Sequence, residues 1–331
     1  MTVAEYMAAC LYDPEDGYYA TRPSIGGANA DFLTAPEASQ MYGELIGLWC
    51  AHEWDALGKP AFNLIELGPG RGVLMQDMLR ATQRVEGFQD SSNVVLVEVS
   101  APLRDEQAER VPQAEWALRL DDAPPGASLI IGNEFLDCLP IRQFVRGEDG
   151  WHEKLVGMDE VDQLTFGLSA ALPAPDSDDE PGTVREVAPA LESLIYELER
   201  RLHEAPGRAL LIDYGYVTPE GADTLQALKR HTKVDPIETP GEADLTAHVD
   251  FARVAHLAEQ AGLDVHGPIT QGLFLRGLGI ELRFKALAEA NPPHAERLAR
   301  EMHRLTSPDQ MGALFKVICL SSPNLPPPAG F

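Results

Sequence analysis

A short apolar run that leads into three closely spaced glycines constrains the fold of this chain more than any other feature. Residues 62–67 are predicted to form a buried strand, residues 64–72 read LIELGPGRG, and a helix is expected over 73–85. At such a junction unpaired backbone N–H groups point outward, and glycine lets the main chain approach a ligand closely. The junction therefore predicts a ligand site where a strand meets the start of a helix.

Strand-like and helix-like segments alternate along the chain, which favours an α/β fold with a mainly parallel sheet. Residues 94–99 (VVLVEV) are rich in β-branched side chains, as expected of a strand covered on both faces. Seven such segments fit one doubly wound sheet, and they are residues 62–67, 94–99, 114–118, 128–131, 208–212, 262–265 and 313–320.

One region interrupts this rhythm after the fourth predicted strand. Residues 141–168 alternate in polarity around the turn 147–150 (GEDG), which predicts an inserted antiparallel meander. The low-complexity segment 173–182 (PAPDSDDEPG) is expected to be a linker, and a helix over about 189–204 returns the chain to the sheet. We therefore divide the chain into an N-terminal cover (1–55) and a main domain (56–331) with an insertion (141–205).

Acidic residues beside the glycine loop indicate which ligand it holds. The spacing GxGxG differs from the dinucleotide pattern GxGxxG, and Glu66 would repel a pyrophosphate but could receive an ammonium group. S-adenosyl-L-methionine carries an ammonium and a sulfonium charge and no phosphate. Glu98, 26 residues beyond Gly72, would then bind the ribose hydroxyls, and Asp121 or Asp122 would meet the adenine amino group. The predicted cofactor residues are Glu66, Gly68, Gly70, Gly72, Glu98 and Asp121.

A polar cluster follows the fourth predicted strand. Ligands of open α/β sheets bind outside the carboxyl ends of the strands, so Asn133, Glu134 and Asp137 are expected to face the transferred group. Two carboxylates and an amide could orient an arginine guanidinium and accept its proton. The alternative is that Glu134 and Asp137 cap a following helix, and the sequence leaves both roles open.

The charge balance excludes some partners. The chain has 52 Asp and Glu residues against 26 Lys and Arg, a formal charge of −26, so a cationic face for nucleic acid is not expected. The acidity could steer a basic protein toward the chain, or serve solubility alone. The four cysteines form no CxxC pair and the histidines no metal spacing, so we expect no metal.

No apolar stretch approaches the roughly 18 residues that a membrane helix needs. The first twenty residues contain four acids and no Lys or Arg, which is unlike a signal or transit peptide. We therefore expect no membrane insertion and a cytoplasmic protein, or a mitochondrial matrix protein if the chain is a mature eukaryotic form.

The chain resembles the MidA-type family of class I S-adenosylmethionine-dependent methyltransferases over nearly its whole length. The matching motifs are Asp13-Pro14, Gly17-Tyr18-Tyr19, Asp31 to Glu37, Ser39-Gln40, Gly43-Glu44, Ile46-Gly47, Trp49, Glu66 to Gly72, Asn133-Glu134-Phe135, Asp137, Leu139-Pro140, Ile212 to Gly215, Ala243 to Phe251, Gln271-Gly272, Met311-Gly312 and Leu314 to Val317. Ala30 departs from the family, which usually has Gly before Asp-Phe.

The resemblance implies a Rossmann-like seven-stranded methyltransferase sheet and a helical N-terminal segment that covers the cofactor, to which Thr34, Pro36 and Glu37 would belong. It also implies a protein arginine N-methyltransferase, because the mitochondrial members modify a respiratory complex I subunit with symmetric dimethylation as the implied product. A homodimer is compatible with it, although no apolar stripe predicts an interface. Two alternatives stay open: an assembly chaperone that binds cofactor and acts by docking, and a nicotinamide-dependent oxidoreductase.

Overall fold

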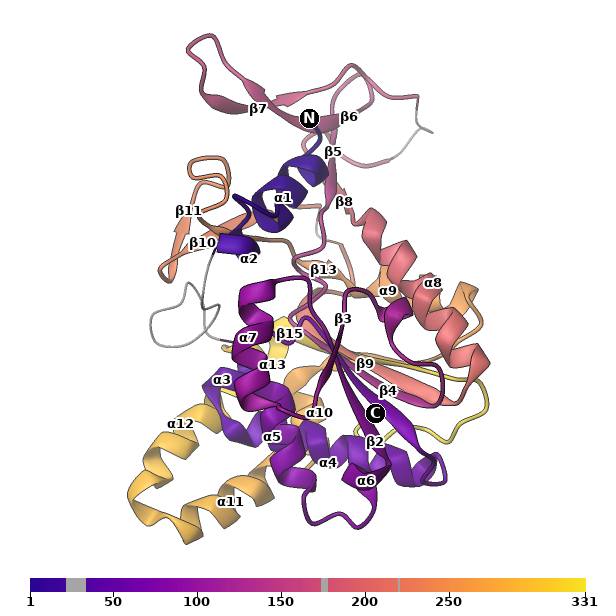
Figure 1. Cartoon of the computed structure of the whole chain (residues 1–331). Helices are drawn as coiled ribbons and strands as arrows, with labels where there is room; N and C mark the ends of the chain where they lie inside the picture. Colours follow the sequence, from indigo (N-terminus) through magenta and orange to yellow (C-terminus); the bar gives the residue numbers. More distant parts are fainter. Residues whose placement is uncertain (22–33, 174–177, 220) are drawn as a thin grey trace.

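The molecule is a central sheet covered by helices, with smaller sheets standing at one end of it (Figure 1). The computed structural model describes residues 1–21, 34–173, 178–219 and 221–331. Residues 22–33, which include Ala30 and Asp31 to Leu33, and linker residues 174–177 lie outside the described part.

The central sheet has the order β14-β15-β9-β4-β1-β2-β3, with β13 paired beside β9. β15 runs antiparallel to β9 and β14, and the other pairs are parallel. The order changes direction between β1 and β4, which is where open α/β sheets bind ligands. All seven predicted strands are confirmed, and the short β13 is added. The strands are β1 (Phe62–Leu67), β2 (Ser92–Val97), β3 (Glu115–Ala117), β4 (Ser128–Asn133), β9 (Gly207–Tyr216), β13 (Val249–Asp250), β14 (Asp264–Thr270) and β15 (Phe315–Ser321).

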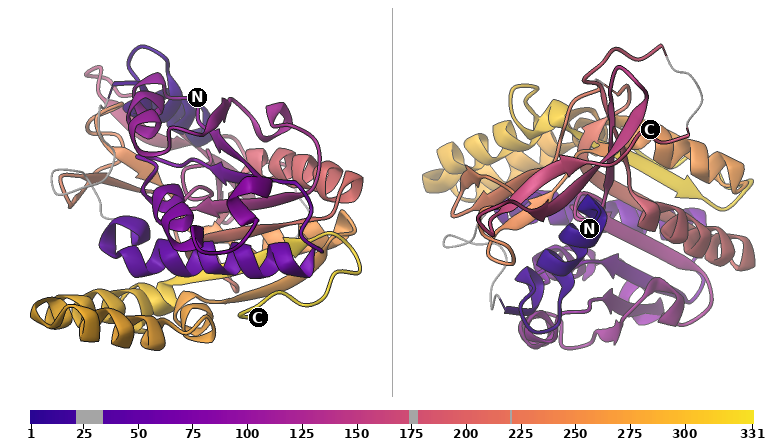
Figure 2. Two further views of the ribbon diagram at one scale, coloured as in Figure 1. Left: turned by 60° about the horizontal axis from the view of Figure 1, so that its bottom comes forward. Right: turned by 90° about the horizontal axis from the view of Figure 1, so that it is seen from above.

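Helices cover both faces of this sheet (Figure 2). In β4, Leu129 and Ile131 belong to one core cluster and Ile130 to the other, because successive side chains of a strand point to opposite faces. Each such side chain contributes about 1.5–3 kcal/mol when fully buried. On one face lie α4 (Gln40–Ala56), α5 (Val73–Thr82), α6 (Phe88–Ser91) and α10 (Gln271–Gly277), and on the other lie α8 (Pro189–Glu204) and α9 (Phe251–Gln260).

Two glycines let α4 pack closely against α5. A Cβ atom at Gly47 would lie 2.7 Å from the Cα of Met78, and one at Gly43 would lie 2.6 Å from the Cβ of Asp77. Any larger residue would push α4 away. The contact ties α4 to the helix that starts at the glycine loop.

The predicted meander forms a separate four-stranded antiparallel sheet of order β7-β6-β5-β8. Its turn closes where the Gly147 N–H donates to the Gly150 carbonyl at 2.7 Å. The fourth strand, β8, follows the linker and returns to pair with β5, which the sequence did not indicate. The strands are β5 (Arg142–Arg146), β6 (Trp151–Met158), β7 (Leu164–Leu168) and β8 (Val184–Val187).

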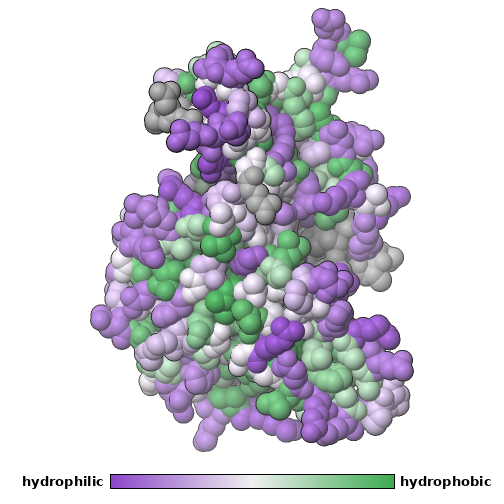
Figure 3. All heavy atoms as spheres, turned by 180° about the vertical axis from the view of Figure 1, so that it is seen from behind, coloured by the Kyte–Doolittle hydropathy of each residue, from purple (hydrophilic) through white to green (hydrophobic). Residues whose placement is uncertain are grey.

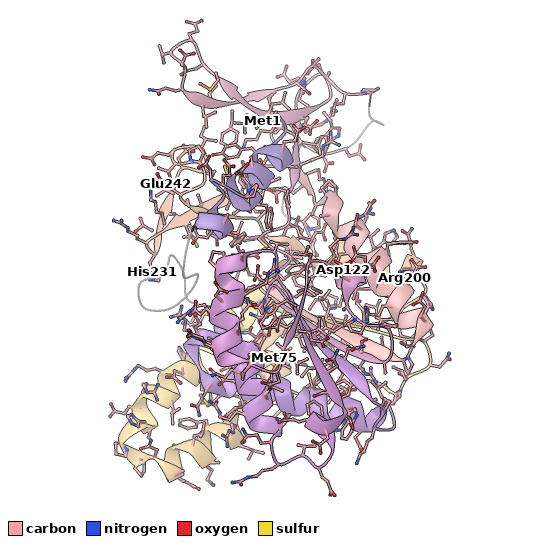
Figure 4. All side chains as sticks on the ribbon, in the orientation of Figure 1. Met1, Met75, Asp122, Arg200, His231 and Glu242 are labelled. Atoms are coloured by element: carbon pink, nitrogen blue, oxygen red, sulfur yellow. The ribbon has the colours of Figure 1, made fainter. Side chains whose placement is uncertain are left out.

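Of the remaining elements, α1, α2 and α3 belong to the helical N-terminal segment that the resemblance implies, and the others were not predicted. Near the meander lie α1, α2 and a three-stranded sheet of order β11-β10-β12, and the Met1 amino group donates to the Val156 carbonyl at 2.9 Å (Figure 4). At the other end α11 and α12 form a projecting helical pair (Figure 1). The bounds are α1 (Val3–Tyr12), α2 (Tyr18–Thr21), α3 (Ala35–Ala38), α7 (Ala101–Arg110), η1 (Leu120–Asp122), β10 (Gln226–Lys229), β11 (Thr232–Val234), β12 (Asp244–Thr246), α11 (Ile280–Ala290), η2 (Pro292–His294), α12 (Ala295–Thr306) and α13 (Met311–Leu314).

The surface is mixed in character. On the face opposite to that of Figure 1, hydrophilic residues alternate with apolar groups (Figure 3). Within the described residues, none of the helices combines the length and apolar character that crossing a bilayer requires.

Candidate cofactor and active site

A cavity of about 670 Å³ lies at the carboxyl ends of β1, β2, β3 and β4. Its size is typical of a site for a small organic ligand. Eight residues predicted from the sequence line it, from four separate parts of the chain: Thr34, Glu37, Glu66, Gly68, Gly70, Glu98, Asn133 and Glu134.

The glycine loop needs its glycines for two reasons. Gly68, Gly70 and Gly72 have φ angles of 59°, 50° and 77°, in the region that residues with a Cβ rarely adopt. A Cβ at Gly68 would lie 2.9 Å from the Phe135 ring, whereas one at Gly70 would meet no protein atom within 4 Å. The space above Gly70 is therefore available to a ligand. Gly72 does not line the cavity and forms the N-cap of α5.

Glu66 is a buried acid with an unsatisfied oxygen. Its side chain is hydrogen-bonded by the backbone N–H of Met75 in the first turn of α5, but its Oε2 has no partner among the described residues. Burial raises the pKa of Glu66 to about 8. A cationic group in the cavity would satisfy this oxygen and favour the ionised form. The orphaned oxygen and the open space at Gly70 thus fit the amino-acid end of S-adenosyl-L-methionine.

Glu98 is held beside the loop by a buried glutamine. Its Oε1 accepts from the Ser100 N–H at 2.8 Å, and its Oε2 accepts from Gln107 Nε2 at 3.2 Å. The same Nε2 donates to the Gly70 carbonyl at 2.6 Å, and Trp116 Nε1 donates to the Gln107 Oε1 at 2.8 Å. Burial raises the pKa of Glu98. Gln107 thus fixes the predicted ribose acid relative to the glycine loop. No sequence motif marks this glutamine.

Asn133 and Glu134 form the polar end of β4. The Oε1 of Glu134 accepts from the Ala35 N–H at 2.8 Å and from Asn133 Nδ2 at 3.1 Å. The hydroxyl of Tyr42 donates to Asn133 Oδ1. Glu134 has a φ of 49°, a conformation that costs about 1–3 kcal/mol in a residue other than glycine and that gathers at functional sites. Burial raises its pKa to about 7.

Asp137 lies behind this pair and does not line the cavity. It is 8% exposed, the Tyr214 hydroxyl binds it, and burial raises its pKa to about 6. Residues 134–141 contain no helix, so the helix-capping alternative for Glu134 and Asp137 is wrong. The turn is held instead by Asp213, whose Oδ2 accepts from the N–H groups of Leu136 at 2.8 Å and Asp137 at 3.1 Å. Burial, and then the charge of Asp137, raises the pKa of Asp213 well above its usual range.

N-terminal residues close one side of the cavity. The hydroxyl of Tyr12 donates to the Cys138 carbonyl at 2.9 Å, and Ser100 Oγ donates to the Tyr19 carbonyl at 2.7 Å. Arg71 of the glycine loop forms an ion pair with Glu37 at 3.4 Å. Thr34, Pro36 and Glu37, expected in the cover, all line the cavity.

Asp121 and Asp122 are not brought to the cavity. Asp121 binds Arg200, and Asp122 Oδ2 accepts the N–H of Arg119 at 3.1 Å, where η1 meets α8 (Figure 4). Leu118, Arg119 and Leu120 form the wall here, together with Glu197 of α8, whose Oε1 accepts from Arg119 Nη2 at 2.7 Å. The sequence did not predict Glu197 as a site residue, because Glu197 lies far along the chain from β3, whose carboxyl end it faces.

Among the described residues, no group of three or more His, Cys, Asp or Glu side chains is arranged to hold a metal ion. The cavity lining includes Glu66, Glu98 and Glu134 with the amide of Asn133, a set that suits an organic cation. Two arginines also line it, and each is paired with an acid, Arg71 with Glu37 and Arg119 with Glu197.

Known proteins share this architecture. Residues 45–269 match the family model described as "Putative S-adenosyl-L-methionine-dependent methyltransferase". A crystal structure of a COG1565 superfamily member from Burkholderia thailandensis, bound to S-adenosyl-homocysteine, has a TM-score of 0.86 and 27% identity, covering 100% of this chain and 89% of that one.

Curated relatives align over almost the whole chain. The protein arginine methyltransferase NDUFAF7 of Xenopus laevis is 36% identical over 375 residues, covering 100% of this chain and 85% of the relative. The human mitochondrial protein of the same name is also 36% identical, covering 97% of this chain and 80% of the relative.

Proposed function

This chain belongs to the family of S-adenosyl-L-methionine-dependent methyltransferases, and on that premise we propose that it methylates an arginine side chain of a protein. One observation carries the choice of acceptor: Glu134 and Asn133 present a carboxylate and an amide to the cavity at the end of β4. A planar guanidinium is well matched by a carboxylate, and the relatives named above are arginine methyltransferases. Membership in this family rules out the nicotinamide alternative.

The cofactor supplies an electrophilic methyl group on sulfur. In the proposed arrangement Glu66 binds its ammonium, the loop of Gly68 and Gly70 lies against its amino-acid end, and Glu98 binds the ribose hydroxyls. Thr34 and Glu37 would cover it from the N-terminal side. Charge complementarity supports this order, because the buried Glu66 has an unsatisfied oxygen and Glu98 retains acceptor capacity in a polar network.

Glu134 would orient the acceptor and take its proton. With a pKa of about 7 in the unliganded chain, its carboxyl is partly protonated near neutrality, and an approaching guanidinium would favour the ionised form. As a nitrogen of the guanidinium bonds to the methyl carbon, the sulfur–methyl bond breaks with its electron pair left on sulfur. The nitrogen then loses a proton to Glu134. Asp137 would act from behind, by fixing the turn with Tyr214.

The variant Glu134→Gln tests this role, because it keeps the shape and one acceptor for the Ala35 N–H. We expect methyl transfer to fall by at least about a hundredfold, the usual contribution of a positioned acid–base group. Cofactor binding should change little. The assay is transfer of labelled methyl to protein in an extract of cells lacking this gene, followed by mass spectrometry of the modified residue.

Glu204→Gln is a matched control, since Glu204 is an exposed acid of α8 outside the cavity. It should transfer methyl at the rate of the unaltered protein. Label on residues other than arginine would contradict the acceptor, and full activity of Glu134→Gln would contradict the role of Glu134.

We further propose that the acceptor is a subunit of a complex I type assembly or a similar protein. The formal charge of −26 supports a basic partner, because opposite charge steers association. Comparison of arginine methylation in cells with and without this gene would identify the acceptor.

The proposed compartment depends on the host: the cytoplasm in a prokaryote, or the mitochondrial matrix in a eukaryote.

A docking role is a second candidate, because the four-stranded sheet of the insertion and its β6–β7 turn carry exposed apolar residues. Met158, Val161 and Leu168 are 59%, 70% and 55% exposed. An assembly chaperone could bind a subunit there without methylating it. Full complementation by Glu134→Gln, with methylation lost, would favour this candidate, and failure to complement would favour catalysis.

A further inference from the structure

We propose that Glu197 of α8 recognises the 6-amino group of the cofactor's adenine, in place of an acid that follows β3. The inference rests on the proposed contacts of Glu66 and Glu98 with the cofactor. It assigns part of the adenine site to a helix that leads out of the insertion and lies far along the chain from the glycine loop.

The order of the strands indicates where adenine lies. β1, β2 and β3 are neighbours in the sheet and parallel. Their carboxyl ends are therefore about 4.8 Å apart, one after the next. The cofactor's amino-acid, ribose and adenine groups follow one another in the same way. With the ammonium at Glu66 after β1 and the ribose at Glu98 after β2, adenine reaches the end of β3.

The cavity wall at the end of β3 suits a purine. Leu118 and Leu120 follow β3, and Leu194 faces them from α8, so apolar side chains are available to both faces of a flat ring. Among the described residues, Glu197 is the only acid that lines the cavity beside Leu118, Leu120 and Leu194. Asp121, the acid expected from the sequence, is held by Arg200 outside the cavity.

Glu197 is almost buried and is held by an arginine. Glu197 is 9% exposed, and Arg119 Nη2 donates to its Oε1 at 2.7 Å. In the part of the chain that the structure describes, no hydrogen bond reaches its second oxygen, Oε2. That oxygen is thus available to an N–H donor in the cavity.

One turn further along α8, Arg201 locks the helix to the loop after β3. Its Nη2 donates to the carbonyls of Leu120 at 3.1 Å and Ala123 at 2.7 Å, and its Nη1 donates to the carbonyl of Pro124 at 2.8 Å. The distance between Glu197 and the β3 wall is therefore fixed by buried hydrogen bonds. A fixed acceptor selects a ligand more strongly than a mobile one.

The chemistry predicts discrimination between two purines. Adenine has a 6-amino group, which donates to a carboxylate, whereas hypoxanthine has a 6-oxo group, which would face Glu197 acceptor to acceptor. A site built to bind a donor rejects an analogue that lacks it. S-adenosyl-L-homocysteine and S-inosyl-L-homocysteine are therefore a suitable pair of probes.

Isothermal titration calorimetry with these two compounds tests the assignment on the intact chain. We expect the unaltered protein to bind the adenosine compound at least about a hundredfold more tightly. Glu197→Gln keeps the size of the side chain and can turn its NH₂ toward a 6-oxo group, so the preference should shrink to about threefold or less. Glu204→Gln, an exposed acid on the same helix, should keep the full preference.

Each of the following results would overturn the proposal. Retention of the full preference by a folded Glu197→Gln would show that another group reads the purine. Loss of the preference in Asp121→Asn alone would assign the role to Asp121. If Glu98→Gln left the affinity for S-adenosyl-L-homocysteine unchanged, the placement of the cofactor would be wrong, and the inference with it. Weakened binding in Glu98→Gln with an unaltered preference in Glu197→Gln would reject the Glu197 assignment alone.

Discussion

Two walls of the cavity are built in different ways. The strand wall, Glu66, Gly68, Gly70 and Glu98, comes from the ends of β1 and β2, which are neighbours in sequence and in the sheet. The assembled wall, Thr34, Glu37, Glu134 and Glu197, comes from the N-terminal segment, the end of β4 and α8.

The two walls are held in place by different kinds of contact. Residues of the strand wall are fixed by backbone geometry and buried hydrogen bonds. Residues of the assembled wall are joined by side-chain contacts between distant segments, such as Arg71 to Glu37 and Arg119 to Glu197. Substitutions in the strand wall should therefore weaken cofactor binding more than substitutions in the assembled wall.

Gly70→Val should have the largest effect. The φ of 50° costs a residue with a Cβ about 1–2 kcal/mol, and the added side chain would fill the space that the ligand needs. We expect the affinity for S-adenosyl-L-homocysteine to fall by about a hundredfold, the upper range for overpacking a site. Calorimetry measures it.

Gly58→Val provides the matched control. Gly58 also has a positive φ, 84°, and no atom within 4 Å of an added Cβ, but it lies in the loop after α4 and outside the cavity. Gly58→Val should lower the unfolding temperature about as much as Gly70→Val does and leave the affinity for S-adenosyl-L-homocysteine unchanged. Equal binding losses in the two variants would show that Gly70 acts through stability alone.

The pH dependence of binding tests Glu66. Its pKa in the unliganded chain is about 8, raised from 4.5 by burial, so the carboxyl is mostly protonated near neutrality. An ammonium binds the ionised form. Affinity for S-adenosyl-L-homocysteine should therefore rise between about pH 6 and about pH 8 and then level off.

Glu66→Gln should remove most of that rise. The variant should bind about tenfold more weakly than the unaltered protein at about pH 8, since a charge-assisted hydrogen bond is lost, and the two should converge near pH 6. An unchanged slope in Glu66→Gln would assign the titration to another group. Titration calorimetry across this range gives both curves.

Arg71→Gln should have the smallest effect, because it breaks a partly exposed contact of the assembled wall. Arg71 joins Glu37 at 3.4 Å and Glu106 at 2.7 Å. We expect cofactor affinity to fall by about threefold, and by less at high salt.

Arg110→Gln is its control, because Arg110 pairs with the same Glu106 at 2.9 Å. It should leave the affinity unchanged. If Arg71→Gln lowered the cofactor affinity as much as Gly70→Val, the proposed difference between the two walls would be wrong.

The strand wall could be predicted from the sequence because its signals are local. The buried run 62–67 became β1 with the same bounds, and Gly68, Gly70, Glu66 and Glu98 all reached one cavity. Hydrophobic runs and glycines act through their own backbone, so short patterns report them.

The assembled wall could be predicted only in part. Asp121 was expected at the adenine because it follows a strand, yet Arg200 holds it outside, and Glu197 enters from α8. β8 pairs with β5 only after the chain returns from the linker, and Gln107 gains its role from Gly70 and Trp116. Such contacts depend on how distant segments meet, which no local pattern encodes.

A crystal structure of this chain with S-adenosyl-L-homocysteine tests the central claim most directly. We predict the ammonium within hydrogen-bonding distance of Glu66, the ribose hydroxyls on Glu98 and the 6-amino group on Glu197, with the sulfur toward Glu134. A ligand in the opposite direction, with adenine at the glycine loop, or one bound outside this cavity, would contradict the account.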